Sequence, residues 1–313
     1  MRRMIGALAI ACAIALTTAG TASAQDAPLP VNFDLTTGIS DALIHPGGFP
    51  PGTNDWNCRP SAAHPRPVVL VHGTGTNAQS NWGVYGPLLK NEGYCVYALT
   101  YGAHKDAPGE LSTIGGMRSM ADSAVEFAAF ADRVLKATGA SKIDVVGHSQ
   151  GTIVPTYYAK RLGGADKIDK YVSLSPIWRG TDIAYAQQLS AFGDAIGATP
   201  VLDATIYAEC AACKQLVQGS PFLTSLEADG VYLPGITYTN IATTGDDVVV
   251  PYTNGVVPGP NVTNIVLQDT CRLDFANHVG TAADERAAMF VLDALDPAHP
   301  HPVPCKFVLP YTG

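Results

Sequence analysis

The sequence predicts an α/β fold with a mostly parallel central sheet and helices on both of its faces. Short apolar runs rich in β-branched residues recur along the chain, as parallel strands covered on both faces require. Helical segments with one apolar face separate these runs. In addition, the run at 143–146 leads directly into Gly147-His148-Ser149-Gln150-Gly151, and a helical pattern follows at once. Apolar residues make up 47% of the chain and charged residues 15%, which is typical of a compact globular protein.

Residues 1–24 are predicted to be a secretory signal peptide. Arg2 and Arg3 form its basic start, Ile5–Leu16 its apolar core, and the small residues at 22–24 its cleavage pattern. The apolar core has about 12 residues, whereas a helix that spans a membrane needs about 20. We therefore exclude the leader from the fold and expect export of the mature chain. An uncleaved membrane anchor is the alternative.

Charge and cysteine content restrict the partners and the compartment. The chain has 19 basic and 27 acidic residues, and loss of the two leader arginines leaves 17 basic ones. This balance argues against nucleic acid or anionic membranes as main partners. Of seven cysteines, six remain without Cys12, and an even number in an exported chain indicates three disulfides with fifteen possible pairings. Cys210 and Cys213 have redox-motif spacing, but without a strand-to-helix context we favour a local structural bridge.

Residues 25–66 are rich in Pro, Gly and Asn and are predicted to be an extended arm or loop, pinned through Cys58. Residues 67–313 are predicted to be the main domain. Its predicted strands are 67–71, 95–99, 143–146, 171–174, 236–241 and 262–267.

Three helices are predicted between and after these strands. The first spans 117–138 and stops at Gly139, and the third spans 282–295. The second spans 150–162, with a slight bend at Pro155 because proline interrupts the helical hydrogen bonds. An insertion at about 176–234 is alanine-rich and shows no strand pattern. Its place after a strand favours a cap or lid over ordinary helices packed on the side.

The pentapeptide 147–151 has the pattern G-x-S-x-G, which is a weak signal by itself. Here a predicted strand enters it and a predicted helix leaves it, which forces a sharp turn and exposes the Oγ of the central serine. Gly147 and Gly151 leave room for close packing, and the helix N-terminus favours developing negative charge. We therefore predict that Ser149 is a nucleophile and not merely a helix cap.

A serine nucleophile needs a base, and the base needs an acid to orient it. With this strand–turn–helix arrangement the chain order is Ser, then Asp or Glu, then His. Of eight histidines, five precede Ser149 and two lie in a proline-rich tail, so His278 is the predicted base. The acid is expected after the strand at 236–241. We prefer Asp246, which directly follows a turn glycine, over Asp247, although residue patterns separate the two only weakly.

Preorganised donors for an oxyanion are each worth about 2.7–4 kcal/mol. One predicted donor is the backbone N–H of Gln150, directly after the nucleophile. The other is expected in the glycine-rich loop 72–76 after the first predicted strand, where we choose Thr74. A phosphate-binding loop is excluded because neither G-x-G-x-x-G spacing nor a following lysine is present.

Motifs from about residue 65 to the end of the chain share one resemblance. They are His72-Gly73-Thr74-Gly75-Thr76, Asn81-Trp82, Gly93-Tyr94-Cys95, Gly147–Gly151, Ser175-Pro176, Arg179-Gly180-Thr181, Asp246-Asp247-Val248-Val249, Cys271 and His278-Val279-Gly280. Together they resemble the secreted class 2 lipases of bacteria, and also the fungal lipase B group. The chain departs from the family in its N-terminal arm and around Cys210–Cys213, so lid behaviour and acyl-chain preference are not transferred.

The resemblance implies an α/β-hydrolase fold and a triad of Ser149, Asp246 and His278. It implies oxyanion donors at Thr74 and Gln150, with the Thr74 side chain also donating, and it favours Asp246 over its neighbour. The disulfides that it suggests are Cys58–Cys95 and Cys271–Cys305, which leaves Cys210–Cys213.

Together these features predict a secreted serine ester hydrolase, a triacylglycerol lipase or carboxylesterase that forms an acyl-enzyme on Ser149. No metal or organic cofactor is expected. The expected partner is a lipid or other ester, with transient contact to a lipid interface, and the expected state is a monomer. Acyl transfer to an alcohol and polyester hydrolysis would use the same residues and remain alternatives. A non-catalytic binding protein is disfavoured because every residue of the site is present.

Overall fold

The computed structural model describes residues 27–182 and 210–313, so the predicted leader and much of the predicted insertion lie outside the described residues. Six strands form one sheet in the order β2-β1-β3-β4-β5-β6, and each neighbouring pair is parallel. The strands are β1 Val68–Val71, β2 Val96–Leu99, β3 Ile143–His148, β4 Ile168–Leu174, β5 Thr237–Ala242 and β6 Val262–Val266.

All six strands lie where apolar runs predict them, with ends that differ by a few residues. β1, β2 and β3 are buried at every position, which explains their continuous apolar sequence. β4 and β5 pair from Lys170–Thr237 to Leu174–Ile241, across the insertion. Because all strands are parallel, their carboxyl ends meet at one edge of the sheet.

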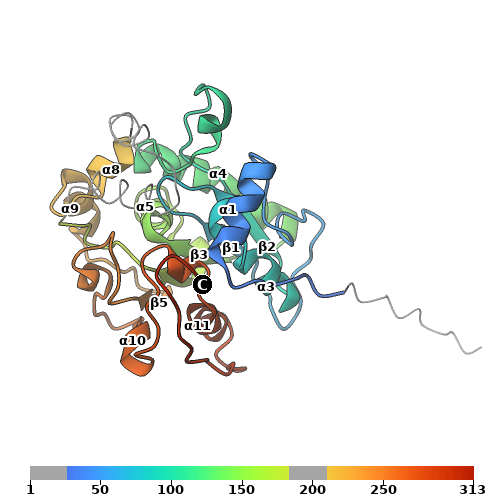
Figure 1. Cartoon of the computed structure of the whole chain (residues 1–313). Coiled ribbons are helices and arrows are strands. Elements are labelled where there is room, and N and C mark those ends of the chain that lie inside the picture. The colour runs from blue at the N-terminus through green and yellow to red at the C-terminus, as the bar shows by residue number, and fades with distance from the viewer. Residues whose placement is uncertain (1–26, 183–209) are drawn as a thin grey trace, which may run out of the picture.

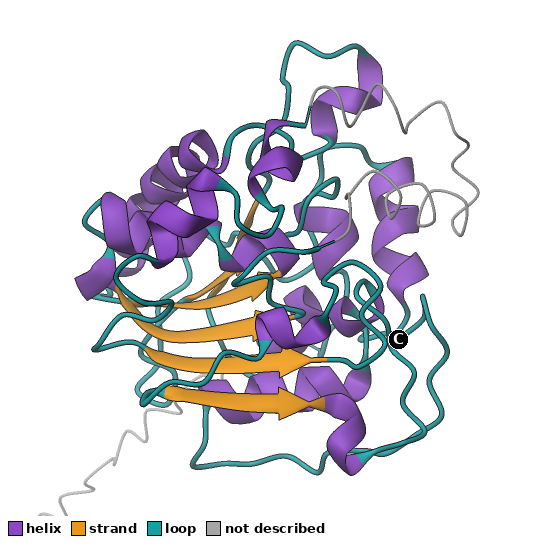
Figure 2. Ribbon diagram, turned by 90° about the vertical axis from the view of Figure 1, so that its left-hand side faces the viewer, coloured by secondary structure: helices purple, strands orange, loops and turns teal. Residues whose placement is uncertain are grey.

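Helices cover both faces of the sheet (Figures 1 and 2). Successive strand residues point to opposite faces. Val69 and Val71 pack with α4 and α5, whereas Val68 and Leu70 pack with α2, α3 and α11. The helices are α1 Leu35–Ile44, α2 Ala78–Trp82, α3 Tyr85–Asn91, α4 Met120–Thr138, α5 Val154–Arg161, α8 Ala211–Gln215, α9 Pro221–Glu227, α10 Leu267–Thr270 and α11 Glu285–Leu295. Within the described residues, no helix is long and apolar enough to cross a membrane.

The N-terminal arm differs from the prediction because it contains α1. Asp34 caps this helix by accepting from the Thr36 N–H at 2.8 Å. The helix lies against α2 so closely that a Cβ on Gly83 would come 2.8 Å from Gly38 Cα. The arm's content of Pro, Gly and Asn predicted a loop, but tertiary packing overrides that propensity.

The helix predicted at 150–162 is also corrected. A 3-10 turn, η2 Ser149–Thr152, comes first, and α5 starts only at Val154. Pro155 lies in the first turn of α5 and not in its interior. A proline there gives up an N–H that has no partner within the helix, so it starts the helix instead of bending it. The first predicted helix is confirmed, and Gly139 ends it at φ +74°.

The structure contains three disulfides, Cys58–Cys95, Cys210–Cys213 and Cys271–Cys305. The first ties the arm to β2, the second lies at the start of α8, and the third ties the C-terminal tail to the segment after α10. The three pairings agree with those that the resemblance suggested.

Candidate active site

The turn from β3 into α5 holds Ser149 in a constrained backbone conformation. Its φ is +55°, a left-handed value that non-glycine residues seldom adopt and that concentrates at functional sites. Ser149 is 2% exposed. Its Oγ has no hydrogen-bond partner among the described residues. Such contacts are often long or misaligned until a substrate is bound.

Two glycines make this turn possible. A Cβ on Gly147 would lie 2.4 Å from the Gly151 carbonyl oxygen, and a Cβ on Gly151 would lie 1.9 Å from that of Val71. Backbone atoms cannot yield as a flexible side chain can. Both positions therefore require glycine, and the start of η2 packs directly on the end of β1.

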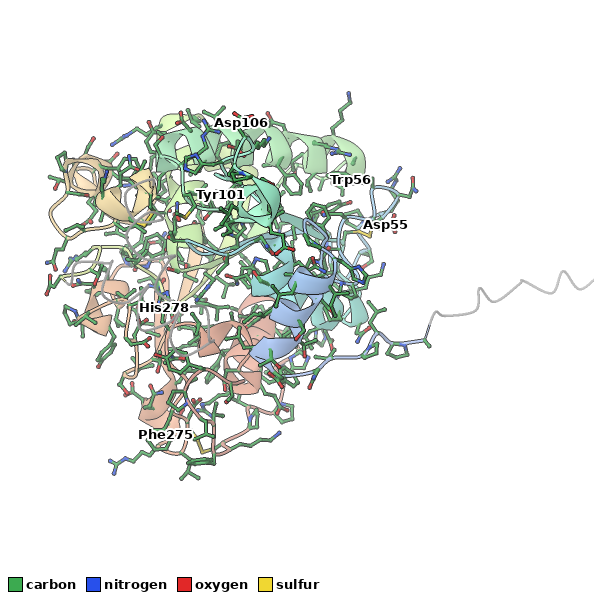
Figure 3. All side chains as sticks on the ribbon, turned by 45° about the horizontal axis from the view of Figure 1, so that its top comes forward. Asp55, Trp56, Tyr101, Asp106, Phe275 and His278 are labelled. Atoms are coloured by element: carbon green, nitrogen blue, oxygen red, sulfur yellow. A yellow bond between two sulfur atoms is a disulfide. The ribbon has the colours of Figure 1, made fainter. Side chains whose placement is uncertain are left out.

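The loops after β5 and α10 bring Asp246 and His278 together. The Nδ1 of His278 is 2.9 Å from Asp246 Oδ1 and 3.0 Å from Oδ2. Asp246 Oδ1 also accepts from the N–H groups of Val248 at 3.0 Å and Val249 at 2.7 Å. Both side chains are buried. Figure 3 shows His278 at mid-height on the left, whereas Phe275, three residues earlier, lies below it near the lower edge of the molecule.

Asp247 bonds to the groups around the imidazole, whereas the His278 ring nitrogen Nδ1 is bonded to Asp246. Its Oδ2 accepts from Tyr311 Oη at 2.6 Å and from Asn277 Nδ2 at 3.0 Å, and its Oδ1 lies 3.4 Å from the His278 N–H. Asn277 Oδ1 in turn accepts from the Tyr311 N–H at 3.0 Å. The C-terminal tail thus clamps the loop that carries His278, and the structure places Asp246, not Asp247, on the ring.

The loop after β1 lies beside Ser149. Thr74 Oγ1 donates to Gln150 Oε1 at 2.6 Å, and the Gln150 side chain is fully buried. Gly116, at φ +71°, has no room for a Cβ, which would lie 2.8 Å from Gln150 Oε1 and 2.9 Å from Thr74 Cα. Gln150 Nε2 has no partner within residues 27–182 and 210–313. The two predicted oxyanion residues are therefore in direct contact through their side chains.

His72 anchors the start of this loop. Its Nδ1 is 2.7 Å from the Gly73 carbonyl oxygen, and its ring stacks on Tyr101 at 4.3 Å between centroids. The Tyr101 hydroxyl donates to the His72 carbonyl at 2.6 Å. Burial lowers the pKa of His72 to about 4, so this imidazole is neutral near pH 7.

All five predicted site residues gather at the carboxyl edge of the sheet, on loops that follow β1, β3, β5 and α10. Sequence reasoning assigned no role to four residues that contact the site residues or their loops: Asn81, His148, Asn277 and Tyr311. His148 stands inside the G-x-S-x-G motif and was considered only as a base, and Asn277 directly precedes His278. Nothing in the sequence marks Tyr311. In the part of the chain that the structure describes, no three His, Cys, Asp or Glu side chains are grouped so that they could hold a metal ion.

Comparison with known proteins gives a family and a fold. The sequence profile of the family described as lipase (class 2) matches residues 65–290. Lipase B of Aspergillus fumigatus, at 18% identity and a TM-score of 0.58, aligns with 82% of this chain and 57% of its own length. The mature lipase of Bacillus licheniformis has 16% identity and a TM-score of 0.48, over 66% of this chain and 85% of its own. The chain thus spans just over half of the fungal protein, and the predicted α/β-hydrolase fold is confirmed.

Proposed function

The chain belongs to the class 2 lipases, a family of carboxylic ester hydrolases, and on that premise we propose that it hydrolyses lipid or other water-poor esters through an acyl-enzyme on Ser149. One observation carries the proposal. The His278 Nδ1 lies within hydrogen-bond distance of both Asp246 oxygens, at the same edge of the sheet where Ser149 is held at φ +55°. This is the arrangement that a serine nucleophile with an oriented base requires.

In the proposed reaction, Ser149 Oγ attacks the ester carbonyl carbon while His278 Nε2 takes the hydroxyl proton. The bond to the alcohol oxygen then breaks, and His278 returns the proton to that oxygen. Water attacks the acyl-enzyme with His278 again as base, the carboxylic acid leaves, and Ser149 regains its proton. Asp246 keeps the Nδ1 proton in place and stabilises the imidazolium that forms.

The proposed oxyanion donors are the Gln150 N–H and Thr74. In this structure the Thr74 hydroxyl donates to Gln150 Oε1. The unpartnered Gln150 Nε2 offers an alternative, because a half-turn of the amide would let nitrogen donate to Thr74 Oγ1. The hydroxyl proton would then be free for the oxyanion. The family resemblance supports this second arrangement during the reaction.

We further propose that the protein is exported and acts as a monomer, with residues 67–313 as the catalytic domain. The leader pattern at 1–24 and the three disulfides support export, because disulfides persist in oxidising compartments.

Hydrolysis of p-nitrophenyl esters of rising acyl length by the wild type and Ser149→Ala tests the proposal. We expect the alanine variant to lose at least about 10⁴-fold in kcat, because base and acid then have no nucleophile to activate. Retained turnover in that variant contradicts the mechanism. Activity that peaks on short acyl chains and is absent on emulsified triglyceride contradicts a lipase and leaves an esterase. Product analysis with added alcohol separates hydrolysis from acyl transfer.

A further inference from the structure

A buried histidine that the proposed mechanism does not use lies between the two halves of the site. His148 is the last residue of β3, directly before Ser149, and it is 3% exposed. Its Nε2 is 3.0 Å from the backbone carbonyl oxygen of His278, and its Nδ1 is 2.9 Å from Asn81 Oδ1. One ring therefore contacts the segment that carries the base and the residue that supports the oxyanion loop.

On the first side, the ring meets the backbone of His278. The carbonyl oxygen of His278 also accepts from Thr281 Oγ1 at 2.8 Å, and the rings of His148 and His278 have centroids 5.0 Å apart. A donor fixed at the end of a central strand thus sets where this carbonyl lies. The position of this carbonyl in turn constrains the His278 Cα, from which the side chain extends.

On the second side, the ring meets Asn81 in α2. Asn81 Oδ1 accepts from the Gly73 N–H at 3.1 Å, one residue before Thr74. Gly73 is pressed against the ring, since a Cβ there would lie 3.3 Å from His148 Nδ1 and 3.2 Å from Ser149 Cβ. The oxyanion loop therefore takes its position from Asn81 and from the His148 ring.

The two contacts share a single proton. Burial lowers the pKa of His148 to about 3, so the ring is neutral near pH 7 and carries one N–H for two acceptors. The carbonyl of His278 can only accept, whereas Asn81 Nδ2 has no partner among the described residues and can turn toward Nδ1. That turn would remove the acceptor from the Gly73 N–H. The base segment and the oxyanion loop are thus coupled through one ring and one amide.

We propose that His148 is a positioning residue, whose Nε2–H donates to the His278 carbonyl and fixes the base relative to Ser149. The inference rests on the proposed function and deepens it. His148 touches no reacting atom in this scheme and acts only through His278 and Asn81.

A matched pair of variants tests the proposal. In His148→Gln the amide reaches roughly the place of Nε2 and can still donate to the His278 carbonyl. In His148→Asn the shorter amide reaches only the place of Nδ1, so the Asn81 contact remains and the His278 contact is lost. We expect His148→Gln to keep kcat within about threefold of the wild type. We expect His148→Asn to lose about 10- to 100-fold in kcat with KM changed less than about twofold, because a small displacement of the base costs rate and not binding.

Active-site titration corrects each rate for the folded fraction. Equal losses in the two variants overturn the proposal, and so does a wild-type kcat in His148→Asn. The ¹⁵N spectrum of labelled histidine tests the same bond without turnover, so it stays decisive even if the wild type hydrolyses no ester. We expect a neutral His148 ring protonated at Nε2, and His278 ring signals that move in the Asn variant but not in the Gln variant. Protonation at Nδ1 alone contradicts the assignment.

Discussion

The turn that carries Ser149 and the loops that carry Asp246 and His278 are held in place by different means. The turn is fixed by backbone packing, since Gly147 and Gly151 fit only without side chains. The two loops are fixed by side-chain hydrogen bonds among Asp247, Asn277, Tyr311 and their neighbours. A substitution in the turn therefore breaks the packing at once. A substitution in the loops removes one bond at a time, and its cost depends on which bond is lost.

The largest expected effect is in the turn. In Gly151→Ala the new methyl group meets the Val71 carbonyl at 1.9 Å, so β1 and the turn must separate. We expect the free energy of unfolding to fall by about 3 kcal/mol or more, and ester hydrolysis to be lost. Urea unfolding followed by circular dichroism measures this. Gly163→Ala is the control for backbone cost alone, because Gly163 has a positive φ and open space around it, whereas Gly151 has no positive φ. A loss in Gly151→Ala no larger than that in the control contradicts packing as what fixes the turn.

Next come the two adjacent aspartates. Asp246→Asn removes the partner of His278 Nδ1, and we expect kcat to fall by about 10⁴-fold because the imidazole loses its orientation and tautomer. Asp247→Asn weakens the clamp on the His278 loop but leaves that partner in place. Its expected loss in kcat is about tenfold or less, consistent with a single weakened hydrogen bond. Steady-state kinetics of both variants on one ester measure the two losses. A larger loss in kcat for Asp247→Asn would show that Asp247, and not Asp246, is the acid.

The smallest effect on turnover is expected behind the His278 loop, at the N-cap of α11. Burial, and then the charge of Asp274, raise the pKa of Asp284 to about 7. A carboxyl with a raised pKa in the folded state contributes stability that is complete below about pH 4 and is lost as pH rises through 7. Asparagine caps a helix equally well, so Asp284→Asn should be more stable than the wild type by about 2 kcal/mol at pH 8 and similar at pH 4.

Thermal unfolding at the two pH values checks this expectation, with kcat unchanged. Asp34→Asn, at the partly exposed N-cap of α1, is the matched control and should gain nothing at pH 8. A gain at pH 8 in the control, or none in Asp284→Asn, contradicts the assignment to burial.

The contrast between the packed turn and the hydrogen-bonded loops also explains which features could be predicted from the sequence. The six strands and Ser149 follow from local patterns, because a buried parallel strand and a strand–turn–helix motif are written in consecutive residues. Asp246 could be preferred only weakly from those patterns, since its distance from His278 depends on two loops. Tyr311 gave no signal, because its bond to Asp247 joins positions 64 residues apart. Helix α1 was missed for a related reason, since its stability comes from packing on α2 and not from its own sequence.

Because β4 pairs with β5 across the insertion, the residues of the proposed site are synthesised at well-separated times. The proposed nucleophile and oxyanion residues have all been synthesised once residue 174 has been made, but His278 follows more than a hundred residues later. At typical rates of synthesis this delay is roughly 5–20 s. Throughout that interval the growing chain holds Ser149 without its proposed base. The order of elements along the polypeptide thus postpones assembly of the proposed triad until almost all of the chain has been translated.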